Sequence, residues 1–248
     1  MFQKRTYRET FNSSRFRSFN VQYLETDLWI GIDPDSYQKQ MEELSLIKVM
    51  ELRQRLDTYI KQKPQFAKTL LPYKPLKSDP VEVIEMADAA ARAGIGPMAS
   101  VAGLFSREVG EVLLQNFSLR ELVIENGGDI FAMVEQKLVL TVFAGNSTLS
   151  EKIGIVIPAR FGKVGICTSA GTIGPSLSFG RADAVAVVCK DILLADAFAT
   201  ALGNEVKSAH EIEQVLKLSE RFPEIISLVI ICDNQVGMRG NLEVKILK

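Results

Sequence analysis

The sequence is poor in the residues that most often build metal centres and disulfide frameworks. Among its 248 residues there are three cysteines, Cys167, Cys189 and Cys232, and a single histidine, His210. The cysteines are far apart, lie in apolar runs and form no Cys-x-x-Cys pair, so we expect neither a zinc site nor a disulfide framework. Buried, reduced thiols are typical of a cytoplasmic protein, which is the predicted location.

The chain also lacks an excess of either charge and a long apolar run. Its 29 basic and 30 acidic residues give a formal net charge of -1, so we expect no nucleic acid and no anionic membrane surface as a partner. No apolar run approaches the roughly 20 residues of a membrane-spanning helix. The first residues, Met1-Phe2-Gln3-Lys4-Arg5, lead into polar residues rather than into the apolar core of a signal peptide.

The sequence does contain apolar strands and amphipathic helices in quick succession. Alternating residues predict a hairpin over 16–32, and helical spacing predicts a long helix over 37–61, followed by a proline-rich connector over 64–80. Further helices are predicted over 81–93, 99–116, 192–202 and 211–221. Strands are predicted over 121–124, 130–134, 138–143, 154–158, 163–168, 182–189, 225–233 and 242–247, with a turn at 237–240.

These elements alternate without a strict βαβ rhythm, which favours an α+β domain with layered sheets and packed helices over a doubly wound fold. We expect one domain over 1–248, in which 1–80 holds the hairpin, the long helix and the connector, and 81–248 forms the core. The long helix and the apolar strands could support a homo-oligomer, although no feature specifies one.

A glycine turn follows the apolar strand at 121–124. The residues Asn126-Gly127-Gly128-Asp129 place two glycines between two oxygen-bearing side chains. Glycines allow positive φ and a close approach of a ligand to the main chain, and amides around them can hold an anion. The same turn would equally serve as a plain connection between two buried strands.

An apolar helix further along the chain carries Asp196 and Thr200, four residues apart. Residues at this spacing lie on one helix face, so a carboxylate and a hydroxyl can point at the same place. Oxygen ligands of this kind suit Mg²⁺. The alternative is that Asp196 is an acidic residue near a helix start and that Thr200 is a packing residue.

The segment 167–180 follows a strand and contains three glycines and five hydroxyl side chains but no charge. Thr168, Ser169, Gly171 and Thr172 supply hydroxyls and amides that suit phosphate, carboxylate or ribose groups. A flexible loop without a ligand is the competing interpretation.

The glycine turn and the Asp196 helix, in this order, resemble the ApbE-like superfamily. Its best-known members are magnesium-dependent flavin transferases, which move FMN from FAD onto a protein Thr or Ser. The sequence is most similar to the UPF0280 branch, with the resemblance running from about residue 86 to residue 204. It implies an ApbE-like (T-fold-like) α+β fold with layered antiparallel or mixed sheets, and a small-molecule ligand.

The resemblance also implies roles for individual residues. Asp196 and Thr200 would hold Mg²⁺, and Asp129 would be a catalytic carboxylate near the reacting phosphate. The remaining cofactor contacts, to FAD or another nucleotide, would come from Asn126, Gly127, Gly128, Thr168, Ser169, Gly171 and Thr172.

Two groups of the family pattern are missing. The transferases carry a histidine-containing segment after the loop, whereas Ser178-Phe179-Gly180 leads directly into the next strand, and His210 lies beyond the helix. Their lysine at a helix start is also absent from Ser100-Val101-Ala102-Gly103-Leu104-Phe105. We therefore predict a Mg²⁺-dependent transferase with altered substrate recognition. The alternatives are a non-catalytic small-molecule binder and a scaffold on the same fold.

Overall fold

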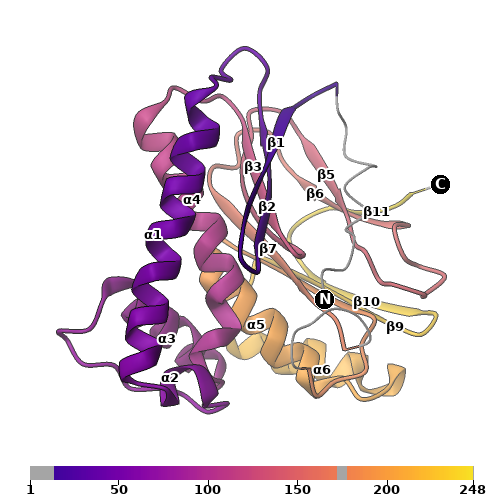
Figure 1. Ribbon diagram of the computed structural model, residues 1–248. Coiled ribbons are helices and arrows are strands. Elements are labelled where there is room, and N and C mark those ends of the chain that lie inside the picture. Colours follow the sequence, from indigo (N-terminus) through magenta and orange to yellow (C-terminus); the bar gives the residue numbers. More distant parts are fainter. Residues whose placement is uncertain (1–13, 172–177, 248) are drawn as a thin grey trace.

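The computed structural model describes residues 14–171 and 178–247, which form three layers (Figure 1). The middle layer is an antiparallel eight-stranded sheet in the order β1-β2-β3-β4-β7-β8-β9-β10. Its strands are β1 (Arg17–Tyr23), β2 (Thr26–Ile32), β3 (Leu122–Asn126), β4 (Asp129–Met133), β7 (Val164–Ser169), β8 (Ala184–Cys189), β9 (Ser227–Cys232) and β10 (Gln235–Gly240).

Helices cover one face of this sheet and a small second sheet covers the other (Figure 1). The second sheet has the order β11-β6-β5, with β5 (Leu138–Thr141), β6 (Ile153–Ile157) and β11 (Val244–Ile246). The α-helices are α1 (Gln40–Gln62), α2 (Gln65–Lys68), α3 (Val81–Ala93), α4 (Val101–Asn116), α5 (Ile192–Glu205) and α6 (Ile212–Leu218). Short 3₁₀ turns are η2 (Pro97–Ser100), η3 (Ala209–Glu211) and η4 (Ser219–Arg221).

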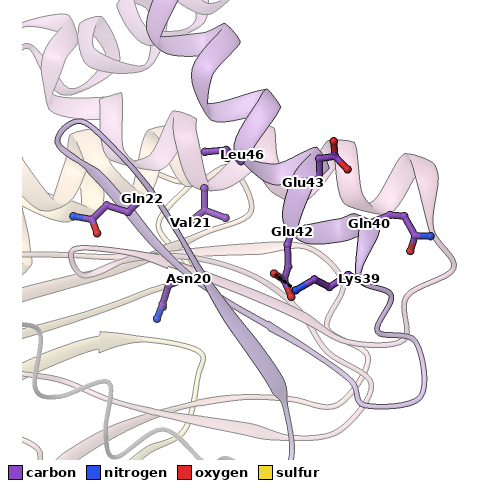
Figure 2. A pocket seen from close by; sticks show the side chains of 8 residues that line it. All are labelled: Asn20, Val21, Gln22, Lys39, Gln40, Glu42, Glu43 and Leu46. Atoms are coloured by element: carbon purple, nitrogen blue, oxygen red, sulfur yellow. Dashed lines mark hydrogen bonds and ion pairs between the residues drawn. The ribbon is translucent and has the colours of Figure 1, made fainter.

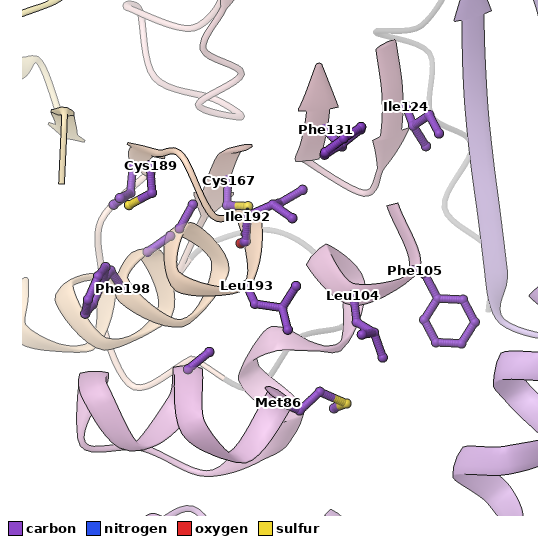
Figure 3. Close-up of a cluster of buried hydrophobic side chains, with 14 of the residues drawn as sticks. Met86, Leu104, Phe105, Ile124, Phe131, Cys167, Cys189, Ile192, Leu193 and Phe198 are labelled. Atoms are coloured by element: carbon purple, nitrogen blue, oxygen red, sulfur yellow. Dashed lines mark hydrogen bonds between the residues drawn. The ribbon is translucent and has the colours of Figure 1, made fainter. Parts of the chain in front are cut away.

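Because side chains alternate along a strand, the inner strands of the large sheet each contribute to two cores; these strands are β2, β3, β4, β7, β8 and β9. On β3, Ile124 packs under the helices while Val123 faces the small sheet. The core beneath the helices joins α3, α4 and α5 through residues such as Met86, Leu104 and Phe198 (Figure 3). Both faces of the central strands are therefore buried, which explains their nearly unbroken apolar sequences.

The α+β class and the layered antiparallel arrangement predicted from the sequence are confirmed. The helix predicted over 81–93 has those bounds, and it ends at Gly94, whose φ of 75° makes a left-handed C-cap. The three cysteines are buried and form no disulfide. Within the described ranges, none of the helices is both long and apolar enough to span a membrane.

One part of the prediction is wrong. The segment 237–240 is not a turn, because it belongs to β10, which pairs with β9 along its whole length. The chain reverses earlier, at Asp233, whose φ is 55°. Gly237 serves packing instead, since a Cβ there would lie 2.2 Å from Ile212 of α6. The strand predicted over 242–247 shortens to β11 and joins the small sheet.

Candidate functional site

Four segments that are distant in sequence lie in contact with one another. They are the start of α4, the turn between β3 and β4, the end of β7, and α5. The Asn126 amide donates to the Ala102 carbonyl oxygen (3.2 Å), and Ser106 Oγ donates to the Asp129 carbonyl oxygen (3.2 Å). These bonds fasten the glycine turn to α4, so Asn126 and Asp129 are held against a helix.

Asp196 lies on α5 and points at the beginning of α4. Its Oδ2 accepts a hydrogen bond of 2.8 Å from the Gly103 amide, and a Cβ on Gly103 would lie only 3.2 Å from that oxygen. Glycine at 103 thus lets the two helices approach closely enough for the carboxylate to reach the amide. No lysine, arginine or histidine in the described part of the chain forms an ion pair with Asp196.

Burial raises the pKa of Asp196 to about 7, and the Gly103 hydrogen bond opposes this rise only in part. The residue is 8% exposed, so its charged form loses most of its hydration and gains no cation in return. A carboxylate in this state gains stability from any positive charge placed beside it.

Asp129 is the second buried carboxylate of the site, at the start of β4 and opposite Cys167 of β7. The Cys167 thiol forms a hydrogen bond with Asp129 and also lies 3.6 Å from the Ile192 carbonyl oxygen. Its pKa is raised well above the usual value, first by burial and then by the negative charges of Asp129 and Asp196. The thiol therefore stays protonated and lies within the electrostatic reach of both carboxylates.

The glycine turn is a two-residue hairpin connection. Asn126 pairs with Asp129, and φ is 67° at Gly127 and 106° at Gly128, as a type I′ turn requires. The Gly128 amide donates to Glu125 Oε1 (2.9 Å), while its carbonyl oxygen accepts from the Thr168 amide (3.2 Å). Since Glu125 occupies the Gly128 amide, this amide is not available to hold an anion in the conformation described.

The end of β7 brings part of the predicted loop to α5. Ser169 lies against Gly203, where a Cβ would be 3.4 Å from Ser169 Oγ. The Gly171 amide donates to the Ala182 carbonyl oxygen (2.8 Å), and a Cβ at Gly171 would lie 2.3 Å from the Gly180 carbonyl oxygen. The two stems of the loop therefore touch. Thr172 lies outside the described residues.

Thr200 is one helical turn beyond Asp196 on α5 and is partly exposed. Its hydroxyl forms no hydrogen bond with the described residues, so its oxygen lone pairs remain available. Across 14–171 and 178–247, no group of three or more His, Cys, Asp or Glu side chains is arranged to hold a metal. A cation here would consequently take few protein ligands and would depend on water or ligand oxygens for the others.

Sequence reasoning missed two members of the site. From the sequence, Gly103 is only a small residue at a helix start without the family lysine, and Cys167 is only a thiol in an apolar run. The order of the motifs along the chain could not reveal either role, because each depends on a contact over more than twenty residues. The single histidine, His210, lies beyond α5, as the sequence predicts, and is exposed on η3.

The surface groove drawn in Figure 2 lies elsewhere. It has a volume of about 550 Å³ and runs between the edge strand β1 and the first turns of α1, with Asn20, Lys39 and Glu42 in its lining. Within the groove, Lys39 Nζ donates to Glu42 Oε2 (3.0 Å), so these two charged side chains pair with each other. None of the site residues predicted from the sequence lines this groove.

Solved structures with a similar fold include flavin transferases. A flavin transferase ApbE from Vibrio cholerae aligns with a TM-score of 0.62 and 12% identity, over 92% of this chain and 96% of that one. The apo form of the Pseudomonas stutzeri flavinyl transferase ApbE aligns with a TM-score of 0.61 and 14% identity, over 90% and 93%. At these identities the likeness establishes the ApbE-like fold alone.

Sequence relatives are closer. The UPF0280 protein of Methanosarcina barkeri is 41% identical over 191 residues, 77% of this chain and 75% of the relative. The UPF0280 protein of Methanocaldococcus jannaschii is 33% identical over 224 residues, 88% of each chain. A family model described as "AbpE bacteria" matches residues 8–219. The chain therefore belongs to the ApbE-like UPF0280 family.

Proposed function

We propose that this protein is a Mg²⁺-dependent transferase of the flavinyl or nucleotidyl type, with substrate recognition that differs from that of the flavin transferases. Asp196 and Thr200 would hold the metal, and Asp129 would assist as the carboxylate nearest to the reacting group. Thr168, Ser169 and Gly171, with Asn126 and the two turn glycines, would contact the ligand.

The observation that carries the proposal is the state of Asp196. This carboxylate is buried, is raised in pKa to about 7, and has the Gly103 amide as its one hydrogen-bond donor among the described residues. Strongly shifted carboxylates without a structural partner are typical of functional sites. A divalent cation would supply the missing positive charge.

The donor set suits Mg²⁺ better than a transition metal, since it offers carboxylate and hydroxyl oxygens. When bound, Mg²⁺ would neutralise phosphate oxygens and hold the ligand in place. Phosphoryl-type transfer depends mainly on positioning and on charge neutralisation. The absence of a histidine near the site therefore leaves this class of reaction open.

Two features favour an altered substrate. The lysine and the histidine of the flavin transferases have no counterpart here, and the Gly128 amide is occupied by Glu125. The same features favour the second candidate, a protein that binds a small molecule on this scaffold without turnover.

The first experiment is a thermal-shift titration with FAD, FMN, ATP and ADP, each with and without Mg²⁺. A ligand that binds only the folded protein raises the melting temperature by mass action. The proposal expects a shift that needs both the nucleotide and Mg²⁺ in the natural protein and that is lost in Asp196→Asn. The matched control is Asp88→Asn, which removes an exposed carboxylate from α3.

Turnover separates the two candidates. Release of a nucleotide fragment, or its transfer to an acceptor, supports the transferase, while Mg²⁺-dependent binding without any product supports the binder. If no nucleotide shifts the melting temperature with Mg²⁺, or if Asp196→Asn responds like the natural protein, the metal site is wrong.

A further inference from the structure

The connector between α2 and α3, residues 69–80, displays large aliphatic side chains to the solvent. Leu70, Leu71 and Leu76 are 55%, 71% and 60% exposed. In Figure 1 the connector stands out from the body of the molecule beside α2 and α3. Exposed aliphatic residues that gather in one segment mark a contact surface more often than isolated ones do.

This exposure does not come from a loose segment. On its inner side the connector is held by Asp79, which accepts hydrogen bonds from Tyr59 Oη (2.7 Å), Lys63 Nζ (2.6 Å) and the Leu76 amide (2.9 Å). The Lys63 hydrogen bond is the main cause that lowers the pKa of Asp79 to about 2. The anchor is therefore charged at any physiological pH.

An aromatic stack holds the same segment from below. Phe66 is fully buried and packs edge to face against Tyr59 and Tyr73, with ring centroids 5.3 and 5.2 Å apart. The chain also presses on Gly96, where a Cβ would lie 2.0 Å from the Thr69 carbonyl oxygen. The leucines are thus presented outward by a segment that is fixed from inside.

Basic residues surround these leucines. The segment 61–81 contains five lysines and one aspartate, a net charge of +4, whereas the whole chain has a net charge of -1. The rest of the protein therefore has a net charge of -5. Lys68, Lys74 and Lys77 are exposed. The one aspartate, Asp79, is the residue that binds Tyr59 and Lys63 on the inner side of the connector.

We propose that this connector patch, consisting of Lys68, Leu70, Leu71, Lys74, Leu76 and Lys77, docks the protein peripherally on an anionic lipid surface. Lysines attract acidic headgroups, and aliphatic side chains among them enter the boundary of the acyl chains. The projecting shape favours lipid over a protein partner, because a bilayer adapts to a protrusion while a protein would need a matching cavity. The expectation of no membrane partner rested on the net charge of the whole chain, which hides this local excess.

Vesicle sedimentation tests the proposal with the full-length protein. We expect binding to phosphatidylcholine vesicles with about 30% phosphatidylglycerol, no binding to phosphatidylcholine alone, and release by high salt. The triple variant Lys68→Gln, Lys74→Gln, Lys77→Gln should bind roughly 100-fold more weakly. Leu70→Ser and Leu71→Ser should each weaken binding about tenfold.

Matched controls lie at exposed positions outside the patch. The triple variant Lys137→Gln, Lys152→Gln, Lys217→Gln removes the same charge, and Ile246→Ser removes an apolar side chain that is 86% exposed. Circular dichroism establishes that every variant is folded.

Absence of binding to anionic vesicles, or equal loss of binding in the patch and control variants, would overturn the proposal. Binding to poly-glutamate but not to vesicles would identify an acidic protein as the partner and would overturn it as well. The lipid contact does not depend on the proposed transferase activity.

Discussion

The regions around Glu121 and Asp196 each bury a carboxylate but treat it in opposite ways. Glu121, just before β3, accepts hydrogen bonds from Arg15 Nε and Nη2 (2.9 and 2.8 Å) and from the amides of Glu135 and Gln136 (3.0 and 2.9 Å). Burial alone would raise its pKa, yet Arg15 and these amides lower it overall. Asp196 has the Gly103 amide but, among residues 14–171 and 178–247, no cationic side chain as a partner, and its pKa is raised to about 7.

The comparison shows that the charged form of Glu121 stabilises the folded state, whereas the charged form of Asp196 destabilises it. Four donors, two of them from a guanidinium, compensate Glu121 for its lost hydration. Asp196 is not compensated within the described residues, so its charged form lowers the stability of the folded state. A cationic ligand beside Asp196 would stabilise the charged carboxylate and so favour the folded state.

The largest effect is expected when the compensated acid is changed. Glu121→Gln should lower the free energy of unfolding by about 3 kcal/mol, because it removes the charge of a buried carboxylate that four donors surround and leaves the partly buried guanidinium of Arg15 without its counter-charge. Urea denaturation at neutral pH measures the loss. The control is Glu135→Gln, which changes an exposed side chain in the connection between β4 and β5 and keeps the backbone amide that donates to Glu121. Equal midpoints for the two variants would remove the contrast with Asp196.

Asp196→Asn should have the opposite sign. The folded-state pKa of Asp196 is raised from 3.8 to about 7, so the folded protein binds more protons than the unfolded chain between these values, and stability falls as pH rises through them. Asn keeps an acceptor for Gly103 but carries no charge. At pH 8 without metal, the variant should therefore be more stable than the natural protein by on the order of 2 kcal/mol.

The pH dependence provides the check on this sign. The two proteins should melt at the same temperature near pH 4, diverge up to about pH 7, and keep a constant difference above it. With nucleotide present, added Mg²⁺ at pH 8 should stabilise the natural protein and leave Asp196→Asn unchanged. A destabilised Asp196→Asn at pH 8 would mean that the carboxylate supports the fold, as Glu121 does.

Local patterns in the sequence were enough for most of the fold. The glycine pair at 127–128 and the period of α3 are read from neighbouring residues, and the structure has a turn and a helix there. The error at 237–240 came from interpreting Gly237 as a turn residue. Its real constraint is the side chain of Ile212, which no local pattern could indicate.

The site was predictable only in its parts. The i, i+4 spacing made Asp196 and Thr200 candidates for a shared site, and the resemblance supplied their order after the glycine turn. What the sequence could not supply is the state of Asp196, because that depends on burial and on Gly103, 93 residues away. The charge of the connector was present in the sequence, but its outward direction required the anchor at Asp79.

Gly103→Ala tests whether the contact between α4 and Asp196 affects Mg²⁺ binding separately from the stability of the fold. The new methyl group would press on the Ile192 carbonyl oxygen (3.0 Å) and on Asp196 Oδ2 (3.2 Å), while alanine favours a helix by about 1 kcal/mol. We expect the unfolding free energy to change by less than about 1 kcal/mol and the Mg²⁺-dependent shift to fall several-fold.

The control is Gly110→Ala on the same helix. Its Cβ would lie 2.4 Å from the Phe131 ring, so it should destabilise the protein by about 1–3 kcal/mol through overpacking and leave any residual Mg²⁺ response intact. If both variants lose stability and metal response together, Gly103 acts through the general packing of α4 and not through Asp196.

The smallest effect is expected at the single histidine. His210 is exposed on η3, where Ser208 and Glu211 already cap the turn through a reciprocal pair of hydrogen bonds. His210→Ala should therefore change the free energy of unfolding by less than about 0.5 kcal/mol and leave both ligand binding and turnover at the level of the natural protein. A tenfold loss of turnover with unchanged binding would place a proton-transfer role on this residue. The chemistry would then have to reach beyond the end of α5, and the two carboxylates near Cys167 could no longer account for the reaction alone.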